Sequence, residues 1–121
     1  MSKSKENKKS KKKINSRAKG ARGEREVAQL LRSYGYEARR GQQYSGSPDS
    51  PDVISSLEGF HIEVKRVEQF NLYKALEQCE KDRGEGEKSL IFHKKNGKPW
   101  TICMDANEFL QLIESLINEG I

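Results

Sequence analysis

The sequence has 121 residues, 34% of them charged and 33% hydrophobic, and a net charge of +5. This length and composition predict one small domain with a modest hydrophobic core. No apolar run is long enough to cross a bilayer and no signal-peptide pattern is found, which excludes membrane-spanning and secreted classes and predicts a cytoplasmic protein. Cys79 and Cys103 both lie in apolar patterns, so we expect reduced core residues rather than a disulfide or a zinc site.

The positive charge is concentrated at the N-terminus. Residues 1–19 contain eight Lys, one Arg and one Glu, whereas residues 20–121 contain 14 Lys or Arg against 17 Asp or Glu. A segment of Lys, Ser and Asn has too little apolar surface to order itself, so we predict a disordered basic tail at 1–19 and a folded domain at 20–121. The tail is expected to attract nucleic acid phosphates, and a purely solubilising role is the alternative.

A first helix is predicted over residues 21–34, because four apolar residues there have helical spacing: Val27, Leu30, Leu31 and Tyr34. Glu24 lies on the same stripe, where a carboxylate requires a metal, a lysine or an arginine as its partner. Alternatively, the helix begins later and Glu24 is a first-turn acid favoured by the helix dipole. Gly20 and Gly23 would let the backbone approach a ligand such as a phosphate.

Residues 36–40 alternate as a short strand, and residues 41–50 form a loop rich in Gly, Gln, Ser and Pro. Several side chains here can hydrogen-bond to nucleic acid or stack on it, although an ordinary polar linker is the alternative: Arg39, Arg40, Gln42, Gln43 and Tyr44.

Residues 52–66 predict a hairpin of two strands with a turn at 57–59. Its second strand alternates between two faces. The apolar face, which we expect to be buried, is formed by Phe60, Ile62 and Val64. The polar face, which is normally solvated, is formed by His61, Glu63 and Lys65. His61 and His93 are interpreted as surface or satisfied histidines, with an approach of His61 to substrate as the alternative.

The polar face of this hairpin carries chemistry. Asp52 lies where the first strand begins and should stand beside Glu63, whereas Asp49 should lie in the loop, so we choose Asp52 as the second acid. Two carboxylates and the Lys65 ammonium on neighbouring strands can hold a hard divalent cation and direct a water against a phosphate. The alternative is a surface salt bridge between Glu63 and Lys65.

The rest of the chain predicts a helix over residues 71–83, strands at 89–92 and 100–104 joined by a turn at 94–97, and a last helix capped by residues 105–108. Lys74 and Gln78 share a stripe of the first of these helices that either faces solvent or lines the site. The last helix has an unusually wide apolar face, which either completes the core or buries against a second subunit.

The chain from residue 19 to about residue 117 resembles the PD-(D/E)xK nuclease superfamily, and within it the archaeal-type Holliday-junction resolvases and their small phage-encoded relatives. Three segments carry the resemblance: Lys-Gly-Ala-Arg-Gly-Glu-Arg-Glu-Val from Lys19, Pro-Asp-Val from Pro51, and Ile-Glu-Val-Lys from Ile62. The resemblance implies an α/β, restriction-endonuclease-like fold, with a mixed central sheet flanked by helices in the order α-β-β-β-α-β-β-α. The long loop before Asp52 departs from the archaeal enzymes and leaves the substrate preference open.

The resemblance also implies roles. Asp52 and Glu63 would ligate Mg²⁺ or Mn²⁺, with the backbone carbonyl of Val64 and the Glu24 carboxylate as further ligands, and Lys65 would orient water or stabilise charge at the phosphate. Basic and polar residues of the first helix, the short strand and the loop would bind DNA: Lys19, Arg22, Arg25, Arg39, Arg40, Gln42, Gln43, Tyr44, Ser45 and Ser47.

The hypothesis is therefore a metal-dependent, structure-selective DNA endonuclease that is encoded by a phage and acts as a homodimer on Holliday junctions. Two alternatives compete with it. The first is a nicking or restriction-like nuclease acting on duplex, flap or single-stranded DNA, and the second is a nucleic-acid-binding module with an idle nuclease site.

Overall fold

The computed structural model describes residues 2–41 and 50–120, with side chains from residue 18 onward. Its elements follow one another as α1 (Ser2–Ser33), β1 (Ala38–Arg40), β2 (Val53–Ser55), β3 (Phe60–Arg66), α3 (Leu72–Asp82), β4 (Lys88–Lys94), β5 (Thr101–Cys103) and α4 (Ala106–Asn118). The helix and strand order predicted from the sequence is therefore confirmed.

The five strands form one mixed sheet in the order β1-β2-β3-β4-β5. Strands β3 and β4 pair in parallel along their whole length, from Phe60 opposite Lys88 to Arg66 opposite Lys94, and every other pair is antiparallel. A parallel pair needs a long crossover, which α3 provides. The hairpin expected at residues 52–66 is β2 and β3, with Val53 opposite Ile62 and Gly59 at a φ of 88° in the turn.

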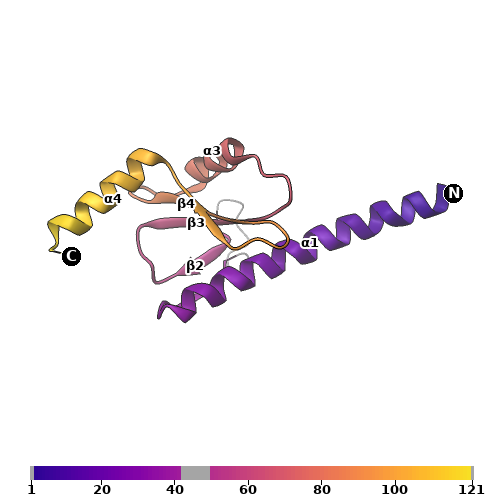
Figure 1. The fold of residues 1–121 in the computed structure, drawn as a ribbon, viewed down its shortest axis with the longest axis horizontal. Helices are drawn as coiled ribbons and strands as arrows, with labels where there is room; N and C mark the ends of the chain where they lie inside the picture. The colour runs from indigo at the N-terminus through magenta and orange to yellow at the C-terminus, as the bar shows by residue number, and fades with distance from the viewer. Residues whose placement is uncertain (1, 42–49, 121) are drawn as a thin grey trace.

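The two faces of the sheet are covered by different helices. The C-terminal half of α1 packs on one face, where Val27, Leu31, Ile62 and Phe92 belong to the larger core cluster. On the other face α3 buries Ala75 and Cys79 against Ile91, and Figure 1 shows the sheet between these two helices.

Because α3 covers the second face, the polar face of β3 is not solvated as the alternation suggested. His61 is 2% exposed and Glu63 is 8% exposed. A single strand cannot reveal which of its faces a distant helix will cover, so the expectation of a wet face was wrong.

Helix α1 extends well beyond the predicted residues 21–34. It begins at Ser2, so the segment expected to be a disordered tail is helical in the structure. Lysine is a good helix former and no Gly or Pro precedes Gly20, which permits the longer helix. In Figure 1 this N-terminal half projects beyond the sheet. The division of the chain at residue 19 stays a prediction.

Two expectations about α1 were also wrong. Tyr34 lies just past the helix end and is 77% exposed, because Gly35, at a φ of 94°, has already turned the chain. Gly23 does not open the backbone to a ligand. A Cβ there would come within 3.0 Å of the Arg66 Cβ, so this glycine permits close packing of α1 on β3.

Helix α4 leaves its apolar face uncovered. None of its residues is buried, and Leu110 and Ile117 are 61% and 64% exposed. Figure 1 shows α4 extending away from the sheet. Among the helices of the described residues, none combines the length and the apolar character that crossing a membrane requires.

Candidate active site

Asp52 and Glu63 meet at the start of the β2–β3 hairpin. The Asp52 backbone N–H donates to the Ile62 carbonyl at 2.9 Å, which continues the pairing one residue before β2 begins. Asp52 Oδ2 accepts a hydrogen bond of 2.8 Å from the Val64 N–H, and its carboxyl also hydrogen-bonds to the Glu63 side chain. The strand register thus brings together the two acids predicted to share a site.

The contact between these carboxyl groups is electrostatically costly. Burial raises the pKa of Asp52 to about 8, and the hydrogen bond and negative charge of Glu63 act in the same direction, against the Val64 N–H that lowers it. Two buried carboxylates in contact cannot both ionise freely. A cation placed between them would remove this conflict.

Glu24 lies inward on α1, as one of the two interpretations predicted. Its residue is 9% exposed, and its Oε1 accepts a hydrogen bond of 2.9 Å from Arg40 Nε on β1. The partner is therefore an arginine, one of the three cations expected for an inward carboxylate. The charge of Glu24 also contributes to raising the pKa of Asp52, so the third predicted acid acts electrostatically on the hairpin pair.

Lys65 follows on β3, on the same strand face as Glu63, and lines a groove of about 360 Å³. Lys74 and Gln78 of α3 line the same groove, together with the Phe70 ring and Asn71, whose side chain caps α3 by accepting from the Lys74 N–H at 3.1 Å. The groove therefore presents two ammonium groups and several side-chain amides, and Lys65, two residues after Glu63 on β3, connects it to the pair of acids. The sequence predicted that Lys74 and Gln78 either face solvent or line the site, and both side chains lie at this groove.

The donor set of Asp52 and Glu63 fits a hard divalent cation, because Mg²⁺ and Mn²⁺ prefer carboxylate oxygens. A second cluster differs in character: one potential ligand atom each from His61, Glu63 and Cys79 lie within 4.8 Å of one another, the one such group found in the described part of the chain. Burial raises the pKa of the Cys79 thiol to about 11, and its Sγ donates to the His61 carbonyl at 3.4 Å. In this second cluster His61 is therefore hydrogen-bonded to both Glu63 and Cys79, and the Cys79 thiol is neutral.

His61 is the residue that sequence reasoning undervalued. Its Nε2 lies 2.9 Å from Glu63 Oε1, and its Nδ1 lies 3.7 Å from Glu87 Oε1. Burial alone would lower the pKa of His61, but the neighbouring carboxylates of Glu63 and Glu87 outweigh it and raise the pKa. The only signal in the sequence was its position two residues before Glu63 on one strand face.

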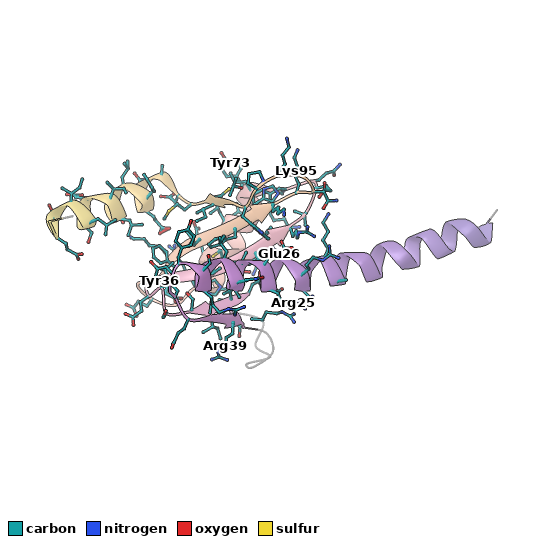
Figure 2. The ribbon with its side chains drawn as sticks, turned by 60° about the horizontal axis from the view of Figure 1, so that its bottom comes forward. Arg25, Glu26, Tyr36, Arg39, Tyr73 and Lys95 are labelled. Atoms are coloured by element: carbon teal, nitrogen blue, oxygen red, sulfur yellow. The ribbon has the colours of Figure 1, made fainter. Side chains whose placement is uncertain are left out.

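The predicted DNA contacts are distributed unevenly. Arg22, Arg25 and Arg39 are exposed, whereas Lys19 pairs with Glu68 at 2.8 Å and Arg40 is held by Glu24. Figure 2 shows Arg25 of α1 and Arg39 of β1 on the same side of the molecule. The remaining candidates lie outside the described residues, as does Asp49: Gln42, Gln43, Tyr44, Ser45 and Ser47. The Val64 carbonyl stays a predicted ligand.

Comparisons with known proteins identify a family and a structural neighbour. The model of a family described as "Phage putative PDDEXK endonuclease" matches residues 15–119. Among solved structures, the chain is similar to the Holliday junction resolvase Hjc of Archaeoglobus fulgidus, an archaeal hyperthermophile. The identity is 25%, the TM-score is 0.53, and the match covers 70% of this chain and 76% of that one. No curated protein sequence matches the chain significantly. The restriction-endonuclease-like fold expected from the sequence is confirmed.

Proposed function

The chain belongs to the family of phage PDDEXK endonucleases, and from this premise we propose that it is a metal-dependent nuclease that resolves branched DNA, with the Holliday junction as its substrate. The family and the similarity to an archaeal Holliday junction resolvase support nuclease activity. The substrate, the metal and the residue roles are the parts that we propose.

One observation carries the proposal. The carboxyl groups of Asp52 and Glu63 are hydrogen-bonded to each other and both are largely buried, with Lys65 next on the strand beyond Val64. A protein that needed only a stable hairpin would not place two acids in contact, since burial penalises both charges. Perturbed carboxyl groups of this kind are typical of functional sites.

The residues fit a divalent ion and suggest how each would act. Asp52 and Glu63 would hold Mg²⁺ or Mn²⁺, which when bound acidifies water and offsets the charge that develops on the phosphate. Lys65 is a compact point charge that stabilises negative charge on the scissile phosphate as water attacks phosphorus and the P–O bond breaks. Glu24, hydrogen-bonded to Arg40, adds negative charge near Asp52 from the α1 side.

DNA is expected to approach over the groove beside Lys65. Lys74 lines that groove with Gln78, and exposed Arg22, Arg25 and Arg39 add positive charge on α1 and β1. Such contacts bind phosphates without reading sequence, as a structure-selective nuclease requires.

A homodimer is part of the proposal. A four-way junction has two-fold symmetry, and paired cuts require two active sites related by a two-fold axis. The exposed apolar face of α4, which includes Leu110 and Ile117, provides a surface for a second copy of the chain.

The test compares DNA substrates. Labelled four-way junction, linear duplex and flap DNA of matched sequence are incubated with the protein in Mg²⁺ or in EDTA. We expect paired cuts in the junction, in Mg²⁺ only, at rates well above those for duplex. Equal cutting of linear duplex would instead identify a nicking or restriction-like enzyme, and binding without metal-dependent cleavage would identify an idle site.

A further inference from the structure

His61 is among the most deeply buried polar residues of the described chain, at 2% exposure on the α3 side of the sheet. An imidazole in such a place must have hydrogen-bond partners, because an unpaired buried polar group destabilises the fold. Its partners therefore indicate what its position serves.

Both ring nitrogens face carboxylates. The Nε2–H donates to Glu63 Oε1 at 2.9 Å, since a carboxylate oxygen can only accept. On the other side Glu87 Oε1 lies 3.7 Å from Nδ1, and this oxygen is itself fixed by a hydrogen bond of 2.6 Å from the Gly84 N–H. The ring is thus placed between a carboxylate of the turn before β4 and a carboxylate of the candidate active site.

The carboxylates of the two candidate metal ligands, Asp52 and Glu63, are held by different hydrogen-bond donors. The Asp52 carboxylate is fixed by a backbone donor, the Val64 N–H at 2.8 Å. Glu63 Oε1 instead accepts from the His61 imidazole, and the hydrogen bond that the Asp52 carboxyl also makes to Glu63 would be lost once both acids bind a cation as carboxylates. Glu63 has a longer side chain than Asp52 and more rotamers, so its orientation depends more on such a donor.

We propose that His61 is a positioning residue that holds the Glu63 carboxylate in the orientation that binds the catalytic cation. This inference rests on the proposed function, because it concerns the same ion. Hydrogen-bond donors behind metal ligands typically change metal affinity about 10- to 100-fold when removed. His61 touches neither the phosphate nor the water in this scheme, and acts only through Glu63.

The test measures Mn²⁺ binding without DNA by calorimetry at one fixed pH. His61→Leu keeps the bulk and removes the donor, and we expect it to weaken Mn²⁺ binding about 10- to 100-fold. His61→Gln restores an N–H donor, and we expect it to recover much of the affinity. The matched control is Leu31→Ala, which removes buried volume from the core on the α1 side of the sheet and should lower the melting temperature while leaving the Mn²⁺ affinity unchanged.

The outcomes are separable. If His61→Leu unfolds, His61→Met, which also lacks a hydrogen-bond donor, takes its place and measures the dependence of the Mn²⁺ affinity on that donor. Unchanged Mn²⁺ affinity in every folded His61 variant would overturn the inference, even where those variants are less stable. If the wild-type protein binds no Mn²⁺, or if Asp52→Asn binds it as well as wild type, the proposed function itself fails.

Discussion

Arg40 on β1 donates a hydrogen bond of 2.9 Å from its Nε to Glu24 Oε1 on α1. The two side chains are 20% and 12% exposed, so each charge depends on the other for compensation. The pair also joins the helix on one face of the sheet to the edge strand next to the loop that precedes Asp52.

We therefore expect Arg40→Ala to lower the free energy of unfolding by at least about 1–3 kcal/mol, because it leaves the Glu24 carboxylate buried and unpaired. Urea unfolding measures the loss. The double variant Arg40→Ala with Glu24→Gln should recover part of it, and Arg22→Ala, at an exposed position of α1, should change stability little. Equal losses of stability in Arg22→Ala and Arg40→Ala would show that the pair of Arg40 and Glu24 has no special role.

The Asp52 carboxyl predicts an unusual dependence of stability on pH. Its pKa is about 8 in the folded protein against 3.8 as the ordinary value, so the folded state holds an extra proton between these limits. Without metal, the free energy of unfolding should therefore fall as pH rises from about 4 to about 8. Asp52→Asn removes the group, so in EDTA its melting temperature should rise relative to wild type as pH approaches 8.

In Mg²⁺ the wild-type protein should instead have the higher melting temperature. The ion stabilises the folded wild-type protein by binding to it, whereas Asp52→Asn would bind the ion weakly. Asp82→Asn, on α3, is the matched control and should follow the wild-type curve. A constant difference between Asp52→Asn and wild type at every pH would contradict the interpretation of the Asp52–Glu63 contact.

Much of this site was predictable from local patterns. Strand alternation placed Glu63 and Lys65 on one face, and the Val-Ile pair after Asp52 set that residue at the strand edge. The helical stripe predicted Glu24 inward. These inferences depend only on backbone periodicity, which the sequence expresses directly.

The rest required contacts between distant segments. Whether His61 is buried depends on α3 crossing over its strand face, and no pattern near His61 encodes that. The contacts of Glu108 also depend on a distant segment. Its backbone N–H donates to the Asp105 side chain, as the predicted cap requires. Its carboxylate, however, accepts from Arg83 at 2.8 Å instead of completing the capping box. A residue 25 positions away determines that choice.

The exposed face of α4 predicts the oligomeric state. Leu110→Asp should convert a homodimer to a monomer, because a carboxylate in an apolar interface is costly to desolvate. Light scattering after gel filtration measures the mass. Ser115→Asp adds the same charge on another face of α4 and should leave the dimer intact. A monomeric wild-type protein, or a dimer unaffected by Leu110→Asp, would rule out this surface.

The basic N-terminal segment predicts salt-dependent DNA binding. Substituting the seven Lys of residues 3–13 by Gln should weaken binding and flatten the plot of log affinity against log salt, by about 0.9 for each phosphate that the segment no longer neutralises. Substituting the same residues by Arg keeps the charge and should preserve the slope. An unchanged slope in the Gln variant would mean that this segment does not contact DNA.

Asp52, Glu63 and Lys65 act together on a phosphodiester bond in the function that we propose. The most direct measurement is single-turnover cleavage of a labelled four-way junction in Mg²⁺, with binding measured in parallel. We expect Lys65→Ala to bind the junction nearly as well as wild type and to lose cleavage by about 100-fold or more, because a group that stabilises charge in the transition state is lost. The control Lys81→Ala, at the exposed C-terminal end of α3, should cut normally. Cleavage by Lys65→Ala at close to the wild-type rate would contradict the account.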